Sequence, residues 1–487
     1  KMQPQGNFIY HGAVSPSKAV RLPHKTEIFP SAIHDLVREH VTEPSVLTTH
    51  DPRNTSGRSP LGQALAKYGT PTVPFNPYRL KYITEDILTE VLTWEAPMGK
   101  RLLTDYEAVF GNEMIDYCDR MNLSASPGYP YTLHRPSGEK GKAYLFDVNS
   151  PDGIIDDDYR YQYLSREKLA KAGIRKVSLW TDCLKDERRP LAKIESGKTR
   201  AFMLPPADYV QLCRKYFMSF CVAFYHNKIN SFSAVGIDPY SFDWTRLVRK
   251  MRRKSNVGFG GDFHSFDGIF DPDILQGVAH IINQWYRTNA HEDYHEEDDV
   301  VRLVLVEEMI HTVHICLDSI YQKTQGNPSG NPLTVIINTF AHCYYLRLAW
   351  LGLAEVSEPD CANMHAFHKN VAEMYYGDDG LLSVKWEAAQ WFNLETVSDF
   401  LLRHKIEYTS ESKEDKYTVR RVVDCTFLKN GFAKLEDTNL WVAPISENTI
   451  YELTNWVRKS DDPLAQLREN LENAIGFAFH HGRTFYD

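Results

Sequence analysis

Short runs of apolar and aromatic residues flank residues 376–379 on both sides. The runs at 372–375 and 381–384 have the length and composition of strands, and the Gly-Asp step between them suits a tight turn. This pattern predicts a β-hairpin with residues 376–379 at its tip. A further apolar run at 256–259 predicts a separate short strand upstream of the hairpin.

The longest apolar run, from Leu333 to about residue 351, predicts a helix. It contains Asn338, His342 and Arg347, so it suits a protein core and not a membrane span, and neither a signal peptide nor a transmembrane segment is visible elsewhere. Residues 1–80 are rich in proline and glycine and are expected to form extended arms with little regular structure. Other helices are expected at 83–120, 209–224, 387–404, 448–458 and 464–477. Strands and helices in this order predict an α+β fold built on an antiparallel sheet.

The chain has 487 residues, of which 43% are hydrophobic, enough to bury a large core in about two to four domains. Its formal net charge of −9 argues against a protein whose whole surface binds nucleic acid, because such a surface would be basic. A basic internal channel is compatible with this charge, since the charges are unevenly distributed. One basic run lies at 246–254, and an acidic run at 292–299 is expected to be a solvated loop.

Eight cysteines occur without a C-x-x-C pair, which indicates free thiols in a reducing compartment and no zinc site. His311 and His314 are expected on one helix with Glu307 and Glu308, and these side chains could ligate a metal. Because no further ligand is evident, we interpret them as a solvated or partly buried helix face.

Two adjacent carboxylates at the predicted hairpin tip, Asp378 and Asp379, are the first candidates for chemistry. Adjacent like charges repel, and Mg²⁺ on hard oxygen ligands would neutralise them and bind phosphates. An ordinary solvated turn explains the same two residues equally well. Asp262 follows the predicted strand at 256–259, so pairing of that strand beside the hairpin would let Asp262 and Asp378 share metal ions.

Three further polar features adjoin the predicted elements. Asp267 lies on a loop before a helix that Asp271-Pro272 would begin, and a capping role alone is the alternative for Asp267. The Gly- and Pro-rich loop 326–334 opens the long helix, and its backbone N–H groups could hold a phosphate. Asn338 lies inside the apolar run, where a buried amide needs specific partners. A helix-capping loop and a satisfied core amide are the alternatives for these last two features.

In chain order, these motifs resemble those of viral RNA-dependent RNA polymerases of the picornavirus-like supergroup. The Asp-x4-Asp pair, the Ser-Gly-x3-Thr-x3-Asn pattern and the Tyr-Gly-Asp-Asp hairpin all match. The resemblance implies that Asp262, Asp378 and Asp379 bind metal at the catalytic centre. It also implies that Asp267 reads the ribose 2′-hydroxyl with help from Ser329, Thr334 and Asn338.

The resemblance extends from about residue 120 to residue 432. The segment 185–200 resembles a basic fingers motif that lines the path of incoming nucleotides, and its basic positions are Lys185, Arg189, Lys193, Lys198 and Arg200. The loop that contains Ser126, Gly128 and Tyr129 resembles one that contacts the RNA template, and the resemblance assigns Gly330 to RNA as well. A solvated charged loop and a plain turn are the alternatives for these two segments.

Two lysines complete the set of matching positions. Lys413 resembles a lysine that protonates pyrophosphate as it leaves, although a surface lysine fits the sequence too. Lys429 resembles the basic residue of a primer-grip hairpin, which meets the primer backbone. Few residues follow this hairpin, so the thumb looks small.

The resemblance implies a right-hand fold with fingers over 1–215, including an N-terminal arm. A palm would cover 216–433 with a short fingers insertion near 290–325, and a small helical thumb would cover 434–487. The implied reaction is template-directed RNA synthesis from nucleoside triphosphates on an RNA template and primer, with Mg²⁺ as the cofactor or Mn²⁺ in its place. Further expectations are a genome-linked protein primer, other viral replication proteins, and a location in the host cytoplasm at membrane-associated replication complexes. The wording of the motifs suggests an insect iflavirus or dicistrovirus.

Two other functions stay open on the residues alone. A reverse transcriptase shares a palm and paired aspartates, but Asp267 and Asn338 favour a ribose and rank it lower. A non-catalytic RNA-binding scaffold is disfavoured because all three carboxylates are retained.

Overall fold

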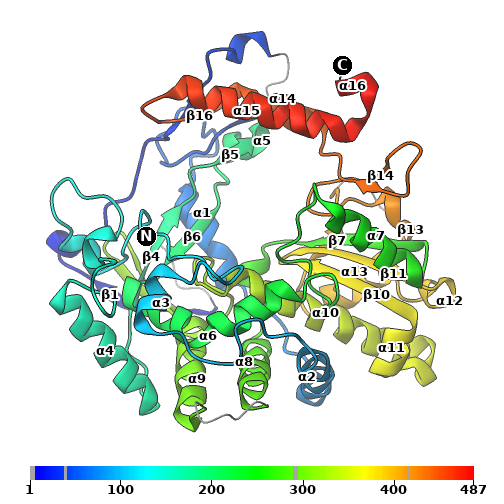
Figure 1. Cartoon of the computed structure of the whole chain (residues 1–487), viewed down its shortest axis with the longest axis horizontal. Coiled ribbons are helices and arrows are strands. Elements are labelled where there is room, and N and C mark those ends of the chain that lie inside the picture. The colour runs from blue at the N-terminus through cyan, green and yellow to red at the C-terminus, as the bar shows by residue number, and fades with distance from the viewer. Residues whose placement is uncertain (1–5, 38–40, 289–293, 414–416, 487) are drawn as a thin grey trace.

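The computed structural model describes residues 6–37, 41–288, 294–413 and 417–486. Its central sheet is built around β7 (Val257–Phe263), which pairs with β11 (Asp379–Val384) on one edge and with β12 (Tyr408–Ser410) and β13 (Arg420–Arg421) on the other. β10 (Val371–Tyr376) lies outside β11, and every pairing is antiparallel (Figure 1). The predicted hairpin, the upstream strand and the antiparallel sheet are therefore confirmed.

Glycines allow β7 to approach its neighbours closely. A Cβ atom at Gly258 would lie 1.9 Å from the carbonyl oxygen of Leu382 in β11. One at Gly261 would lie 2.0 Å from the hydroxyl of Tyr408 in β12. Because no side chain fits at such distances, these glycines allow the close contacts on both sides of the strand that carries Asp262.

The long apolar helix is α10 (Thr334–Ser357), which confirms the prediction of a core helix. It is buried on nearly every face and contacts α2 (Pro77–Val91), α8 (Pro272–Arg287), α13 (Leu394–Arg403) and β10. A helix in this position fixes the hairpin from behind. The N-cap of α8 is Asp271 with Pro272 at the first helical position, as its sequence predicts.

A second sheet has the strand order β1-β9-β8-β4-β6. Its strands are β1 (Phe8–Ala13), β4 (Leu179–Leu184), β6 (Ala201–Leu204), β8 (Val313–Cys316) and β9 (Ser319–Lys323). A helical layer beside it is formed by α4 (Asp157–Lys171), α6 (Ala207–His226), α8 and α9 (Glu296–Ile310). One hydrophobic core, rich in tryptophan, tyrosine and phenylalanine, runs continuously through both layers and under the central sheet.

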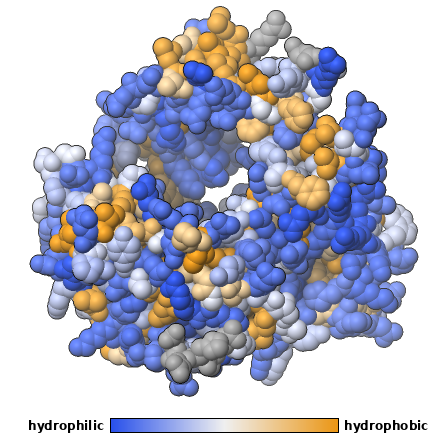
Figure 2. Space-filling model, in the orientation of Figure 1, coloured by the Kyte–Doolittle hydropathy of each residue, from blue (hydrophilic) through white to orange (hydrophobic). Residues whose placement is uncertain are grey.

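The N-terminal segment reaches the C-terminal helices and closes the molecule into a ring. β2 (Ile28–Pro30) pairs with β16 (Trp456–Arg458), which lies between α14 (Glu447–Asn455) and α15 (Pro463–Ala478). β3 (Thr42–Pro44) pairs with β5 (Arg188–Pro190) of the basic segment. The ring is seen at the top of Figure 1, and Figure 2 shows a hollow in the centre of this face, edged largely by hydrophilic residues.

Shorter elements complete the chain. The helices are α1 (Pro60–Ala66), α3 (Asp105–Phe110), α5 (Leu191–Glu195), α7 (Phe242–Lys254), α11 (Met364–Asn370), α12 (Trp386–Ala389) and α16 (Arg483–Tyr486). Two short strands, β14 (Ala433–Lys434) and β15 (Trp441–Val442), pair with each other. The 3₁₀ turns Lys67–Gly69 and Phe266–Gly268 adjoin the site described below.

Several predicted helices differ from the observed ones. The expected helix over 83–120 is wrong beyond Val91, because α2 ends there and α3 is separated from it by a loop. The expected helix over 387–404 is divided into α12 and α13, since Asn393 begins a new helix with a capping box. The expected helix over 448–458 ends at Asn455 and continues as β16, which the N-terminal arm recruits by strand pairing.

Two charged segments also differ from their predictions. The described part of the acidic run lies mainly in α9, where Asp298 and Asp299 are buried and Asp299 pairs with Arg302 at 2.6 Å. These acidic residues therefore serve packing and ion pairing in addition to solvation.

His314 does not share a helix with His311: it is fully buried in β8, and its Nδ1 lies 2.8 Å from Asp182.

All eight cysteines are free, as the absence of paired motifs predicts. Within the described ranges, none of the helices combines the length and the apolar character needed to cross a bilayer.

A buried ion-pair cluster anchors the hairpin strand β10 to the helices behind it. Arg347 of α10 is fully buried and lies 2.5 Å from Glu373 of β10 and 2.6 Å from Asp86 of α2. The hydroxyl of Tyr375 also donates to Glu373 at 2.8 Å. A buried guanidinium of this kind is stable only while its carboxylate partners remain.

We expect Arg347→Met to lower the free energy of unfolding by about 3–5 kcal/mol, because the buried carboxylate of Glu373 loses the guanidinium that pairs with it. Chemical denaturation measures this change. The matched control is Arg468→Met, which removes an exposed pair with Glu472 and should change stability by no more than about 0.5 kcal/mol. Equal effects of the two substitutions would contradict the anchoring role.

Candidate active site

The turn of the hairpin brings three aspartates to one place. Asp379 is the first residue of β11 and lies directly opposite Asp262 of β7 in the antiparallel register. Asp378 precedes it in the turn, after Gly377 with a φ of 62°. The convergence of Asp262 with the Asp378–Asp379 pair, which the sequence predicts only if the strands are neighbours, is present in the structure.

Helix α10 holds the turn in position from below. The backbone N–H of Gly377 donates to the hydroxyl of Thr339 at 2.9 Å, and the Nδ1 atom of His342 lies 3.1 Å from the carbonyl oxygen of Gly377. Burial lowers the pKa of His342 to about 3, so its imidazole is neutral and donates through Nδ1. The sequence analysis did not assign roles to Thr339 or His342.

The surroundings of the aspartates disfavour their charged forms. Burial, with the nearby charge of Asp262, raises the pKa of Asp378 to about 6. Burial, with the charges of Asp378 and Asp262, raises the pKa of Asp379 to about 7. The side chain of Asp378 still contacts solvent at the tip of the turn, but the surrounding protein atoms and the neighbouring carboxylates disfavour its charged form. This donor set of clustered carboxylate oxygens suits a hard divalent cation.

A lysine partly offsets this repulsion. The Nζ atom of Lys413, in the turn after β12, lies 2.6 Å from a carboxylate oxygen of Asp262. In the described part of the chain, no three His, Cys, Asp or Glu side chains are arranged so that they could hold a metal ion by themselves. This holds for the three aspartates too, so a cation bound there would need further ligands, such as phosphate oxygens, from outside the chain.

Asp267 lies in the 3₁₀ turn after β7 and is held from two directions. The Nδ2 atom of Asn338 donates to Oδ1 of Asp267 at 3.0 Å, so the two residues that the resemblance assigns to the sugar are in contact. The Nζ atom of Lys67 lies 3.7 Å from Oδ2 of Asp267. The Nδ2 atom of Asn327 donates to Oδ1 of Asn338 at 2.7 Å and so fixes the orientation of that amide. Sequence analysis missed Lys67, which has no local signal, and Asn327, which stood unassigned inside the Gly- and Pro-rich loop.

The other residues of that loop hold its backbone. The hydroxyl of Thr334 accepts from the N–H of Gly330 at 3.3 Å and donates to the carbonyl of Asn331 at 2.8 Å. The carbonyl of Ser329 accepts from the N–H of Met203 at 3.3 Å. A Cβ atom at Gly330 would lie 2.0 Å from the carbonyl of Met203. The structure shows no contact of Ser329 or Thr334 with Asp267, so their predicted help in reading the sugar stays a prediction.

The basic segment lies close enough to the aspartates for their charges to act on Arg200 and Lys185. Arg200 forms an ion pair with Glu187, which raises the pKa of Arg200, and the charges of Asp378 and Asp267 raise it further. Burial lowers the pKa of Lys185, as does the neighbouring Arg200, while Asp267 opposes the shift. Three basic side chains lie further along β5, α5 and the loop that follows: Arg189, Lys193 and Lys198. This side of the site is therefore positive, in contrast to the net charge of the chain.

The remaining predicted residues differ in exposure. The hydroxyl of Ser126 accepts from the N–H of Gly128 at 3.3 Å, and a Cβ atom at Gly128 would lie 2.4 Å from the carbonyl of Pro205. Tyr129 is 9% exposed, so its ring packs in the protein and offers no stacking face here. Lys429 is exposed in a turn, and its charge opposes the rise in the pKa of Asp379.

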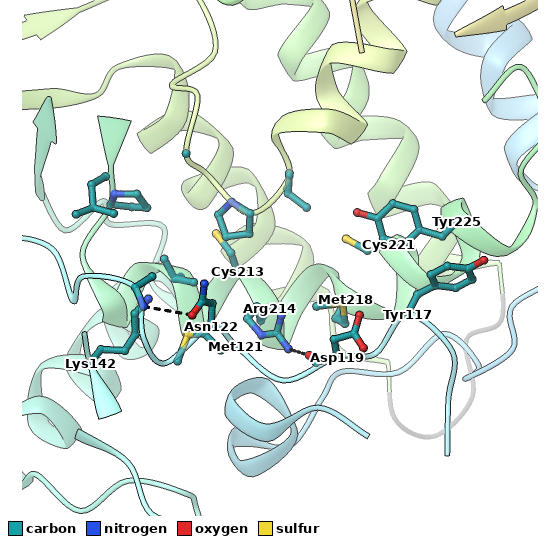
Figure 3. Close-up of a pocket in the computed structure, with 17 residues that line it drawn as sticks. Tyr117, Asp119, Met121, Asn122, Lys142, Cys213, Arg214, Met218, Cys221 and Tyr225 are labelled. Atoms are coloured by element: carbon teal, nitrogen blue, oxygen red, sulfur yellow. Dashed lines mark hydrogen bonds between the residues drawn. The ribbon is translucent and has the colours of Figure 1, made fainter. Parts of the chain in front are cut away.

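A cavity of about 370 Å³ opens between the 117–125 loop and α6 (Figure 3). Gly330 and Leu333 also line it, so it adjoins the loop that precedes α10. Lys142 and Arg214 line this cavity, and burial lowers the pKa of Lys142 to about 8, with a further contribution from Arg214. The cavity therefore lies between Gly330 and the loop that begins the predicted template segment, with two basic side chains and Asp119 in its lining.

Comparison with known proteins identifies the class to which this fold and site belong. The chain matches the family described as viral RNA-dependent RNA polymerase over residues 31–487. It belongs to this family, and the relatives that it matches are polyproteins of picornavirus-like viruses, as its motifs implied.

The relatives are segments of larger viral proteins. The chain is 33% identical over 483 residues to the genome polyprotein of Rice tungro spherical virus (strain Vt6), covering 95% of this chain and 14% of that protein. It is 32% identical over 476 residues to the replicase polyprotein of Acute bee paralysis virus (strain Rothamsted), covering 96% of this chain and 24% of that protein. The chain thus spans less than a quarter of the length of each of these relatives.

Among solved structures, the chain is similar to a Sicinivirus 3Dpol RNA dependent RNA polymerase. The TM-score is 0.77 at 21% sequence identity, over 96% of this chain and 90% of that chain. This similarity confirms the predicted right-hand polymerase fold.

We expect Asp262→Asn to lower the pKa values of both Asp378 and Asp379, because it removes one of the charges that raise them. NMR titration of metal-free protein labelled with ¹³C at the aspartate carboxyl carbons measures both values. The control is Asp399→Asn, which changes an exposed residue of α13. Unchanged titration of Asp378 and Asp379 in Asp262→Asn would show that the three carboxyl groups are not electrostatically coupled.

Proposed function

We propose that this chain replicates a positive-strand RNA virus genome by transferring nucleotides from nucleoside triphosphates to the 3′ end of a primer on an RNA template. The observation that carries the proposal is the antiparallel pairing of Asp379 with Asp262, with Asp378 adjacent, beside the hydrogen-bonded Asp267–Asn338 pair. The first set supplies phosphate chemistry and the second supplies a polar contact for a sugar.

The three carboxylates are proposed to act through divalent ions. Bound between Asp262, Asp378 and the triphosphate, two Mg²⁺ ions, or Mn²⁺ in their place, would lower the pKa of the primer 3′-hydroxyl and neutralise charge on the leaving pyrophosphate. Asp379 supports this site from the first position of β11. The raised pKa values of Asp378 and Asp379 support the proposal, because a pair that is costly to ionise alone gains most from a bound cation.

The positive residues take roles on the substrate side. Lys185 and Arg200 are proposed to hold the triphosphate, and Arg189, Lys193 and Lys198 to extend the positive path by which it arrives. Lys413 is proposed to leave Asp262 and to give a proton to the departing pyrophosphate, a kind of help that contributes roughly 10²–10⁴-fold to rate. Lys429 contacts the primer backbone, and the loop with Ser126, Gly128 and Tyr129, together with Gly330, guides the template.

The wider setting is also a proposal. The fingers comprise residues 1–215, the palm 216–433 and the thumb 434–487. RNA, nucleoside triphosphates, a genome-linked protein primer and other viral replication proteins are the partners. The place of action is the host cytoplasm, at membrane-associated replication complexes.

We expect Asp378→Ala to abolish nucleotide incorporation while leaving the fold nearly intact, because Asp378 lies in an exposed turn and carries chemistry and not packing. Primer extension on a homopolymeric template with Mg²⁺ measures incorporation, and circular dichroism measures folding. Asp399→Ala, at an exposed position of α13, is the control and should keep wild-type activity. Full activity of Asp378→Ala would remove the metal assignment, and an inactive wild-type protein would favour a non-catalytic scaffold.

We expect Asn338→Ala to lower the preference for ribonucleotides by about tenfold, because Asp267 loses the amide that orients it, at a cost near that of a charge-assisted hydrogen bond. The ratio of kcat/KM for a ribonucleotide to that for its deoxy analogue measures the preference. The control is Thr339→Ser at the next residue of α10, which keeps the hydroxyl that holds Gly377. An unchanged ratio in Asn338→Ala would exclude the sugar-reading role.

A further inference from the structure

A buried amide outside the recognised motifs joins two distant segments of the chain. Gln325 precedes the Gly- and Pro-rich loop and is 5% exposed. Its Nε2 atom donates to the carbonyl of Gly268 at 2.7 Å and to the carbonyl of Thr70 at 2.8 Å. Its Oε1 atom accepts from the side-chain Nδ2 of Asn7 at 2.7 Å and from the backbone N–H of Thr72 at 3.4 Å. Both polar atoms of this side chain thus hold the N-terminal segment against the turn that contains Asp267.

Each of the two carbonyls that Gln325 holds lies close in sequence to one partner of an ion pair. Gly268 directly follows Asp267, and Thr70 directly follows the 3₁₀ turn that begins with Lys67. The ion pair between Lys67 and Asp267, with its separation of 3.7 Å, is formed across the same two segments. A Cβ atom at Gly268 would lie 2.8 Å from the carbonyl of Lys67, so these segments are already in close contact. The Gln325 amide therefore fixes how Lys67 is placed relative to Asp267.

The position of Gln325 is itself fixed by a buried lysine. Lys323 is fully buried, and its Nζ atom donates to the carbonyl of Gly326 at 2.8 Å and to the carbonyl of Gln325 at 3.1 Å. No carboxylate forms an ion pair with this Nζ in the described part of the chain. The carbonyls of Gln325 and Gly326 satisfy it instead, so the backbone at these two residues is held in one position. Gly326, with a φ of 83°, is so close to the Asp267 carbonyl that a Cβ atom would lie 2.5 Å from it.

The same loop also holds the second partner of Asp267. The backbone N–H of Asn327, two residues after Gln325, donates to the carbonyl of Asp267 at 2.7 Å. The side chain of Asn327 then orients the Asn338 amide, which donates to the Asp267 carboxylate. Both contacts of that carboxylate, Lys67 on one oxygen and Asn338 on the other, therefore depend on the loop that Gln325 and Lys323 lock.

We propose that Gln325 is a specificity-determining positioning residue, which sets the orientation of the Asp267 carboxylate and thereby the choice of ribose over deoxyribose. The proposal rests on the function proposed above. Gln325 touches neither nucleotide nor metal and acts through the Gly268 and Thr70 carbonyls. The N-terminal segment, far from the aspartates along the chain, is thereby part of the apparatus that selects the sugar.

The test is Gln325→Glu, which keeps the shape of the side chain and replaces the donating NH₂ by an oxygen that faces two carbonyl oxygens. We expect the ratio of ribo- to deoxyribonucleotide kcat/KM to fall by about 5–10-fold, the scale of one or two lost hydrogen bonds. The fall should come mainly from a raised KM for the ribonucleotide, because orientation of Asp267 is lost and the metal-binding aspartates are unchanged. Gln390→Glu, the same substitution at the exposed end of α12, is the matched control and should keep the wild-type ratio.

A second variant covers the case in which Gln325→Glu does not fold. Asn7→Ala removes one of the two donors to Oε1 of Gln325 and leaves the N–H of Thr72, and we expect it to lower the ratio in the same direction by about 2–3-fold. A ratio within error of wild type in a folded, active Gln325→Glu protein would overturn the proposal, as would an unchanged ratio in Asn7→Ala if the first variant does not fold. The proposed function fails separately, through absent incorporation by the wild-type protein and by Gln390→Glu.

Discussion

The approach of β11 to β7 is the constraint on which the site depends. Gly258 of β7 has no side chain where the carbonyl of Leu382 in β11 approaches, so the strand that carries Asp262 lies against the strand that begins at Asp379. Antiparallel register then places carboxylates opposite one another, where burial and mutual repulsion raise the pKa values of Asp378 and Asp379. Buried contacts hold this arrangement in place. Helix α10 holds the turn through Thr339 and His342, and Arg347 holds β10 through Glu373.

The polar contacts divide into two sets that share α10. One set, Thr339 and His342, fixes the hairpin turn from the helix face beneath it. The other, Asn338 with Asn327, fixes Asp267 at the neighbouring end of β7. Because successive residues of one helix serve both, metal binding and sugar reading are placed relative to each other by a single rigid element. The positive side chains of the basic segment come from a different sheet, so the opposite wall of the site is set independently.

Local pattern was enough to predict the hairpin, the strand before Asp262, the core helix and the Asp271 cap, since each has a signal within a few neighbouring residues. Motif order was enough to predict the family and to single out Asp267 and Asn338, which the structure shows in contact. Contacts between distant segments gave no such signal. Lys67 of the N-terminal arm pairs with Asp267, Gln325 bonds to the adjacent Gly268, and β16 is a strand only because β2 pairs with it. The acidic run was misjudged for another reason: Asp299 is buried because Arg302 and Arg287, both nearby in sequence, neutralise it.

The pairing of β2 with β16 has a consequence for how the molecule is made. Residues 28–30 can complete their strand only when residues 456–458 are available, so contacts at the largest separations along the chain must form late during synthesis and folding. Glu452 adds to this closure by accepting from the backbone of Val41 and Thr42. Until that step, the basic segment joined to β3 has no fixed wall opposite it. In a nascent chain the site around the catalytic strands would therefore stay open, and it would become enclosed only when α14, β16 and α15 have been made.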